Sequence, residues 1–255
     1  MQILHSKIQG EGKPLIILHG YFGMGDNWKS QANKLAENYQ VHLIDQRNHG
    51  RSFHSNDFDY ELLVEDLEKY MESYGIDTAY ILGHSMGGKT AMLFAVSYPE
   101  KVDKLIVADI GPKNYPPHHH QILEALNAVD FSKITLRTEV DTILKEYIKE
   151  QGVRQFLLKN VYRKTKDMLD FRFNLDSLTD NNIEVGAALP AFAEYQGEVL
   201  FLRGENSAYI SNDDVALIKA HFSNAEIITI PNAGHWLHAE NPVDFLREVS
   251  LFLEK

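Results

Sequence analysis

Short runs rich in Ile, Leu and Val alternate along this chain of 255 residues with segments that have the hydrophobic spacing of helices. Continuous apolar runs of this length are typical of strands buried on both faces, as in a parallel sheet covered by helices. We therefore expect an α/β fold built from right-handed βαβ units, with a mostly parallel central sheet and helices on both faces. The runs span residues 15–18, 41–44, 80–82, 105–108, 199–202 and 226–230, and residues 3–8 are expected to add an edge strand.

Two of the helical segments carry signals for their ends. The apolar spacing of residues 60–74 stops at Gly75, which stands where a helix C′ residue is expected. Near the C-terminus, Asn241 and Pro242 are the residue types favoured at the N-cap and at the first position of a helix.

The alternation stops between about residue 112 and residue 190. Apolar residues at helical spacing predict successive helices there, around residues 123–129, 140–148 and 153–161, with no strand run between them. We predict a helical cap at 112–190, inserted into a sheet domain made of residues 1–111 and 191–255.

A serine between glycines follows the run at 80–82, in the motif Gly83-His84-Ser85-Met86-Gly87-Gly88. The helical pattern of residues 89–98 comes next, so the motif is G-x-S-x-G between a strand and a helix, where a sharp turn exposes a nucleophilic serine. The Met86 N–H would then stand at a helix N-terminus and face a developing oxyanion. We predict that Ser85 is a nucleophile.

A serine hydroxyl needs a base, and the base needs a carboxylate to orient it. The best candidate base is His235, which lies between the last strand run and the last helix. Two places can supply the acid. One is the loop after residues 199–202, although Ser207 stands where an aspartate is expected and Asp213 and Asp214 come later. The other is Asp109, directly after the run at 105–108.

Three other polar segments differ in what they can contribute to a site. The glycine turn after residues 15–18 can aim a second N–H at an oxyanion, from Tyr21 in preference to Phe22. The turn containing Asp45 and Arg47 is expected to be structural. The three histidines at 118–120 are adjacent and cannot easily converge on one metal ion, so we expect a solvent-facing loop there.

Composition excludes several classes of protein. The chain has no cysteine, which excludes disulfides, thiolate metal sites and a cysteine nucleophile. A net charge of -11 disfavours nucleic acid as a partner, and no apolar run approaches the ~18 residues of a membrane span. We expect no metal and no cofactor, because no metal-ligand or nucleotide-binding motif is present. The first residues do not resemble a signal peptide, so we expect a cytoplasmic protein.

With these residues in view, the chain resembles the α/β-hydrolase superfamily over essentially its whole length, and within it the YbfF-type esterases. The resemblance implies a serine esterase or thioesterase whose acid follows the sixth strand, which matches Asp109. Gly111 departs from the alanine expected in this family. The motifs that carry the resemblance are His19-Gly20-Tyr21-Phe22-Gly23, Asp45-Gln46-Arg47-Asn48-His49-Gly50, Gly83-His84-Ser85-Met86-Gly87-Gly88-Lys89, Ala108-Asp109-Ile110-Gly111-Pro112, Gln155-Phe156-Leu157-Leu158-Lys159, Arg172-Phe173-Asn174 and Gly234-His235-Trp236-Leu237-His238-Ala239-Glu240.

We therefore expect a cofactor-independent hydrolase of small acyl esters or acyl thioesters, with Ser85, Asp109 and His235 as the triad and with Met86 and Tyr21 as oxyanion donors. The alternatives are a cofactor-free haloperoxidase or perhydrolase on the same fold, and a non-catalytic ligand-binding receptor. Residues 145–172 carry eight basic and four acidic side chains. This excess is either a set of solvated helix faces or a landing area for an anionic leaving group such as coenzyme A.

Overall fold

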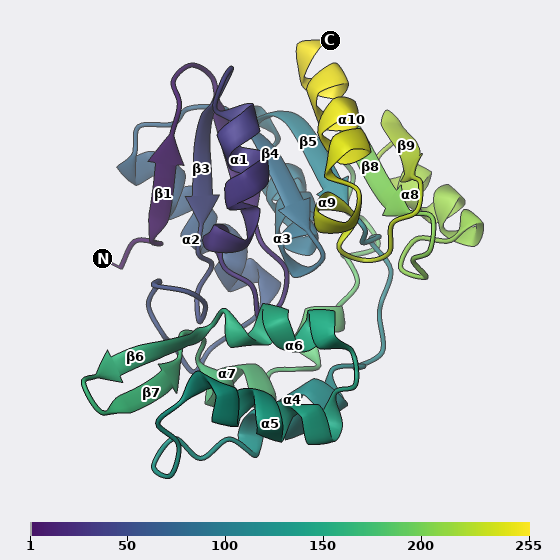
Figure 1. Ribbon diagram of the computed structural model, residues 1–255. Helices are drawn as coiled ribbons and strands as arrows, with labels where there is room; N and C mark the ends of the chain where they lie inside the picture. The colour runs from purple at the N-terminus through teal and green to yellow at the C-terminus, as the bar shows by residue number, and fades with distance from the viewer. Residues whose placement is uncertain (1) are drawn as a thin grey trace.

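The computed structural model describes residues 2–255, and its centre is one seven-stranded sheet with helices on both faces (Figure 1). The strand order is β1-β3-β2-β4-β5-β8-β9, in which β1 is antiparallel to β3 and every other pair is parallel. The expected mostly parallel sheet is confirmed, and its edge strand lies at 6–9 rather than 3–8. The strands are β1 (Ser6–Gln9), β2 (Pro14–Leu18), β3 (Gln40–Ile44), β4 (Ala79–His84), β5 (Val102–Ala108), β8 (Glu198–Gly204) and β9 (Ala225–Ile230).

The apolar runs are continuous because the sheet is buried on both faces. Leu15 and Ile17 of β2 pack in one cluster with the helices α1 (Lys29–Leu35) and α10 (Pro242–Glu254). Ile16 and Leu18 pack in another cluster with α2 (Tyr60–Ser73), α3 (Met86–Ser97) and α8 (Val215–His221). Successive residues of a strand point to opposite faces, so each apolar run supplies both layers. The same layers contain α9 (Leu237–Glu240) and the 3-10 turns η1 (Gly25–Trp28), η2 (Pro99–Lys101) and η4 (Asn212–Asp214).

The expected helix ends are confirmed. Gly75 has φ +64° just after α2, which is the left-handed conformation of a helix C′ glycine. The Asn241 side chain accepts a hydrogen bond from the Asp244 N–H, 3.2 Å away, and so caps α10.

A second group of elements lies below the carboxyl ends of the strands in Figure 1. A separate apolar cluster joins this group to Tyr21, Phe22 and Met86 of the sheet domain. We propose that residues 112–190 form one cap and that 1–111 and 191–255 form the core. The cap elements are α4 (His120–Asn127), α5 (Arg137–Tyr147), α6 (Gln151–Leu158), β6 (Val161–Thr165), β7 (Met168–Phe171), α7 (Leu175–Asp180) and the 3-10 turn η3 (Glu184–Gly186).

The expectation of only helices in this segment was wrong at one place. The third helix ends at Leu158, and Val161 begins β6 of an antiparallel hairpin with β7. An apolar residue such as Val161 suits the buried face of a helix or of a strand, so its place in the helical spacing was ambiguous. In β7 the buried Leu169 and Phe171 flank Asp170, an alternation too short to recognise as a strand.

Within residues 2–255, no helix combines the length and the apolar composition that crossing a bilayer requires.

Candidate active site

Ser85 occupies a tight turn between β4 and α3. Its φ of 53° lies in the left-handed region, which is strained for a serine. A Cβ on Gly83 would lie 2.2 Å from the Gly87 carbonyl oxygen, and a Cβ on Gly87 would lie 2.4 Å from the Leu18 carbonyl oxygen. Both glycines are therefore required by the close approach of backbone segments, and the expected turn is confirmed.

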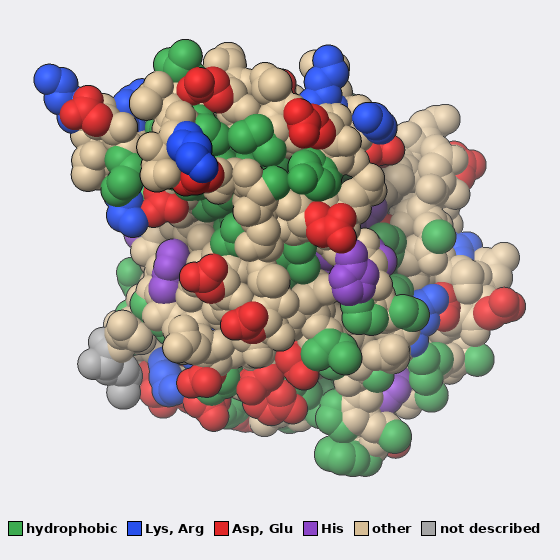
Figure 2. All heavy atoms as spheres, turned by 90° about the horizontal axis from the view of Figure 1, so that it is seen from below, with side chains coloured by type: hydrophobic (Ala, Val, Ile, Leu, Met, Phe, Trp, Pro, Cys, Tyr) green, Lys and Arg blue, Asp and Glu red, His purple; other side chains and the backbone are tan. Residues whose placement is uncertain are grey.

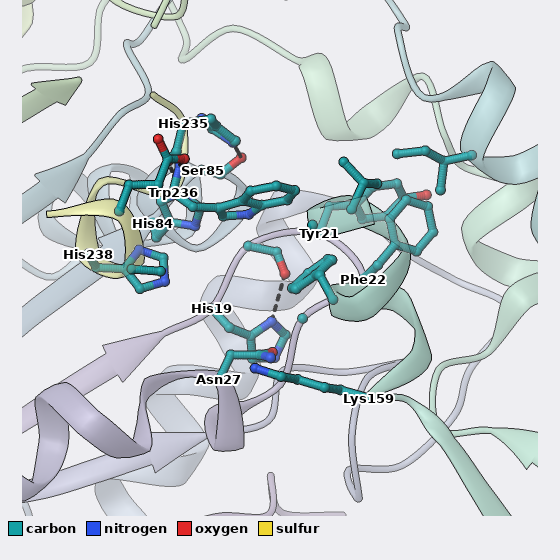
Figure 3. Close-up of a pocket in the computed structure, with 18 of the residues that line it drawn as sticks. His19, Tyr21, Phe22, Asn27, His84, Ser85, Lys159, His235, Trp236 and His238 are labelled. Carbon is teal, nitrogen blue, oxygen red and sulfur yellow. Dashed lines mark hydrogen bonds between the residues drawn. The ribbon is translucent and has the colours of Figure 1, made fainter. Parts of the chain in front are cut away.

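Three side chains from distant parts of the chain form a hydrogen-bonded series. Ser85 Oγ lies 3.1 Å from His235 Nε2, and His235 Nδ1 lies 2.8 Å from Asp109 Oδ2. Asp109 follows β5 directly, and His235 lies in the loop between β9 and α9. Parallel strands end at one edge of the sheet, so the loops after β4, β5 and β9 meet there, and Figure 3 shows Ser85 beside His235.

Both places that could have supplied an acid converge on this series. The Asp109 side chain is fully buried; its Oδ1 accepts the Gly204 N–H at 2.9 Å, and its Oδ2 accepts the Ser207 hydroxyl at 2.5 Å. The hydroxyl at the position where an aspartate was expected thus supports the Asp109 carboxylate. Asp214 instead pairs with Lys113 at 2.7 Å, and Asp213 is exposed.

The loop after β2 is held from two sides. The Phe22 N–H donates to His49 Nε2 at 3.2 Å, and the Phe22 carbonyl accepts from Asn160 of the cap at 2.8 Å. The Tyr21 hydroxyl donates to the Leu178 carbonyl, also in the cap, at 2.6 Å. The backbone donor of Phe22 is therefore already engaged, and Phe22 itself has a φ of 57°.

Two neighbours of His235 were not identified from the sequence. The Tyr209 ring stacks on the His235 ring, with centroids 3.9 Å apart and planes 14° apart. His84 Nε2 lies 2.8 Å from the His235 carbonyl oxygen. Burial lowers the pKa of His84 well below its usual value, so a neutral His84 donates this bond. His84 stands inside the serine motif, which was an available signal, whereas nothing in the sequence marks Tyr209.

The expectation of a solvent-facing histidine loop was wrong for part of residues 118–120. His118 Nε2 lies 2.6 Å from the Tyr209 hydroxyl, and the His119 ring packs 5.0 Å from the Tyr21 ring. Both histidines line the pocket, and burial lowers the pKa of His119 to about 3. Of the three, His118 and His120 are exposed to solvent, as expected, so the expectation fails for the half-buried His119. Across residues 2–255, no three His, Cys, Asp or Glu side chains are grouped to hold a metal ion.

The turn after β3 is structural, as expected. The Asp45 carboxylate accepts the N–H groups of Gly25 and Arg51 at 2.7 and 2.9 Å. The buried Arg47 guanidinium binds both carboxylate oxygens of Asp66, at 2.6 and 3.0 Å. These contacts fix the loop that carries His49, which in turn holds Phe22.

A pocket of about 490 Å³ opens above Ser85 and is mostly apolar. Its cap wall includes Ile122, Val153 and Phe156, and its core wall includes Tyr21 and Trp236. Figure 3 shows Ser85 and His235 at one end of the pocket and Lys159 at the other. Of the eight basic residues at 145–172, Lys159 is the one that lines this pocket, as far as residues 2–255 show.

The strand order and the position of the serine turn define an α/β hydrolase. The model of the alpha/beta hydrolase fold family matches residues 13–137, and relatives match nearly the whole chain, so the chain belongs to this family. This confirms the resemblance found in the sequence.

Among the relatives are esterases and lipases. The chain is 38% identical to the sn-1-specific diacylglycerol lipase ABHD11 of Danio rerio, over 96% of this chain and 80% of that protein. It is 34% identical to Esterase YbfF of Escherichia coli K12, over 96% of this chain and 94% of that protein. A solved structure described as a marine microorganism esterase superimposes with a TM-score of 0.96 at 45% identity, covering 99% of this chain and 100% of that one. These relatives support an ester hydrolase.

Proposed function

We propose that this chain is a serine hydrolase that cleaves carboxylic esters or thioesters through an acyl-enzyme intermediate. The observation that carries the proposal is the hydrogen-bonded series from Ser85 through His235 to the buried Asp109, which opens onto an apolar pocket. A nucleophile, a base and an orienting carboxylate in this geometry are the parts that acyl transfer needs.

In the proposed reaction, Ser85 Oγ attacks the acyl carbonyl carbon while His235 Nε2 takes its proton. The Asp109 carboxylate accepts the Nδ1–H of His235, which fixes the tautomer and stabilises the imidazolium. His235 then gives the proton to the departing alcohol or thiol, and the acyl group stays on Ser85. Water, activated by the same histidine, hydrolyses this acyl-enzyme and frees Ser85.

Two backbone N–H groups are proposed to bind the oxyanion. Met86 is the first residue of α3, so its N–H has no acceptor within the helix and points out of the helix N-terminus. The second donor is Tyr21, because the Phe22 N–H is engaged by His49. Such donors stabilise charge that develops only in the transition state.

The substrate is proposed to carry an apolar acyl chain. The pocket is mainly apolar, with a few polar groups near Ser85, and this composition favours an acyl group over a polar one. Relatives named esterase and lipase act on esters. The thioester branch rests on Lys159, whose ammonium at the far end of the pocket can attract an anionic leaving group.

The test is reaction of Ser85 with a fluorophosphonate, together with hydrolysis of nitrophenyl esters of graded chain length. We expect stoichiometric labelling of the wild-type protein, no labelling of Ser85→Ala, and a loss of turnover of about 10⁴-fold or more in that variant. A folded wild-type protein that neither labels nor hydrolyses any ester would instead favour a ligand-binding receptor. Peroxide-dependent bromination in the absence of ester hydrolysis would favour a haloperoxidase.

A further inference from the structure

Lys89 is a buried lysine that the proposed reaction does not use. It is the fourth residue after Ser85, in the first turns of α3, and its side chain is 1% exposed. Its Nζ donates to the carbonyl oxygens of Lys113 at 2.5 Å and Ala187 at 2.6 Å, and lies 5.1 Å from the centre of the Tyr115 ring. Within residues 2–255, no carboxylate lies within ion-pair distance of this Nζ.

The two carbonyls belong to the two segments that join the cap to the core. Lys113 lies on the segment that leaves β5 for α4, and Ala187 lies on the segment that returns from η3 towards β8. The segments also bind each other: the Tyr115 N–H donates to Gly186, and the Leu189 N–H donates to Pro112, at 2.8 and 2.9 Å. We call residues 112–115 and 186–189 the hinge segments.

A buried lysine without a counter-ion needs a reason, because desolvating its ammonium costs several kcal/mol and the neutral amine also gives up its hydrogen bonds to water. An apolar side chain of similar length would fill the same space at no such cost. It could not, however, bind two carbonyl oxygens on separate segments at once. The lysine therefore gives α3 a direct bond to each hinge segment.

The hinge segments are also connected to the reacting residues. The Tyr115 hydroxyl accepts the Gly111 N–H at 2.8 Å and donates to the Tyr209 carbonyl at 2.7 Å. The Tyr209 ring stacks on His235. The start of α3 therefore connects the reacting serine to the cap. Ser85 directly precedes α3, and Lys89, in its first turns, binds both hinge segments.

We propose that Lys89 is a positioning residue that fixes the cap above Ser85 by binding both hinge segments. The proposal rests on the hydrolase function proposed above. The cap supplies the pocket wall at Ile122, Val153 and Phe156. We expect a long acyl chain on Ser85 to contact this wall and an acetyl group to contact it little. Loss of the Lys89 bonds should therefore weaken binding of long-chain substrates and affect short ones little.

The test compares Lys89→Met with Lys104→Met in the full chain. Lys104 is the control: it is also buried, donates to one backbone carbonyl (Phe252, 2.9 Å) and lies 5.4 Å from the Phe252 ring, at the opposite end of the strands from the cap. Unlike Lys89, it also pairs with a carboxylate, that of Glu198 at 3.2 Å. We measure kcat and KM for nitrophenyl acetate and nitrophenyl decanoate, and hydrogen exchange of the Tyr115 and Leu189 amides.

For Lys89→Met we expect KM for the decanoate to rise roughly 10- to 100-fold, with kcat for the acetate within a few-fold of wild type. The Tyr115 and Leu189 amides should exchange faster than in wild type, and Lys104→Met should change neither property. A purely structural role would lower activity on both esters alike.

Lys89→Gln is measured alongside, in case the methionine variant does not fold; its shorter neutral side chain cannot reach both carbonyls, and the same changes are expected. Wild-type chain-length preference and wild-type amide exchange in a folded Lys89 variant would overturn the proposal. If the wild-type protein hydrolyses no ester, the proposed function fails, while the exchange rates still decide whether Lys89 holds the hinge segments.

Discussion

At the scale of single residues, the carboxylate that orients His235 belongs to Asp109, and the Ser207 hydroxyl supports it. Asp109 binds His235 with the same oxygen that accepts the Ser207 hydroxyl. An asparagine at 109 could still accept from Gly204, but its amide would face His235 Nδ1 and favour the wrong tautomer. We expect Asp109→Asn to lower kcat by about 10³- to 10⁴-fold without unfolding the protein.

The controls for this prediction lie in the later loop. Ser207→Ala removes one donor to the carboxylate and should lower kcat by roughly 10- to 100-fold, since one hydrogen bond to a charged group contributes about 1.5–3 kcal/mol. Asp213→Asn changes an exposed side chain and should leave kcat unchanged. Steady-state kinetics of the three variants decide the matter: a larger loss in Asp213→Asn than in Asp109→Asn would move the acid to the later loop.

Lys89 should also make stability depend on pH. Burial, assisted by the neighbouring Lys113, lowers the pKa of Lys89 to about 7, whereas an unfolded lysine titrates near 10.4. Between these values the unfolded chain holds a proton that the folded chain has released, so folding becomes more favourable as pH rises. Below pH 7 both states are protonated and this contribution is constant. The group facing Lys89 from the hinge segments, besides Lys113, is Tyr115.

We therefore expect the free energy of unfolding of the wild-type protein, relative to Lys89→Met, to rise between pH 7 and pH 9 by at most about 1.4 kcal/mol per unit. Urea unfolding at pH 6, 7, 8 and 9 measures it. A difference that stays constant over this range would mean that the two carbonyl acceptors keep Lys89 protonated.

At the scale of elements, the sequence predicted the structure best where close backbone packing allows only one local conformation. The glycines around Ser85 and the apolar run before them predicted the β4–α3 turn, because backbone segments approach too closely for any side chain. The β6–β7 hairpin could not be predicted, because Val161 suits the apolar face of a helix or a strand equally. Tyr209 could not be placed beside His235, nor His118 beside Tyr209, since these contacts join loops that only the folded sheet brings together.

The serine turn gives a direct test of that argument. In Gly87→Ala the new Cβ would lie 2.4 Å from the Leu18 carbonyl oxygen and 2.6 Å from that of His19, both backbone atoms that cannot move freely. We expect the free energy of unfolding to fall by roughly 1–3 kcal/mol, and ester turnover to fall as Ser85 shifts. Thermal and urea unfolding measure the loss.

Gly152→Ala is the matched control, because it lies in α6 and no heavy atom lies within 4 Å of the position that an alanine Cβ would take there. Alanine at this position should raise stability by about 0.4–1 kcal/mol through the unfolded state. Equal effects of the two substitutions would show that glycine at 87 is not required by close packing.

At the scale of the whole molecule, the charge of residues 145–172 differs in sign from that of the chain as a whole. The net charge is -11, yet the eight basic residues at 145–172 outnumber the acidic ones there by four. Two of them are engaged in ion pairs: Arg154 is buried and pairs with Asp141, and Lys164 pairs with Asp170. On the face in Figure 2, Lys and Arg side chains lie apart from one another among Asp and Glu. The face seen in Figure 2 therefore shows no continuous basic surface for an anionic leaving group.

Lys159 is the basic cap residue placed to act on a substrate, because it lines the pocket opposite Ser85. An anionic leaving group such as coenzyme A would be attracted to its ammonium, and this attraction is screened by salt over a Debye length of about 10 Å at 0.1 M. We expect Lys159→Met to lower kcat/KM for an acyl-CoA by about two- to fivefold, equivalent to roughly 0.5–1 kcal/mol, and to reduce its dependence on ionic strength. A neutral nitrophenyl ester of the same acyl chain should be unaffected by either change. Lys166→Met, which removes the same charge from the exposed β6–β7 turn, should behave as wild type. Equal salt dependence for both substrates would show that Lys159 does not attract the leaving group. No hydrolysis of acyl-CoA would confine the protein to uncharged esters.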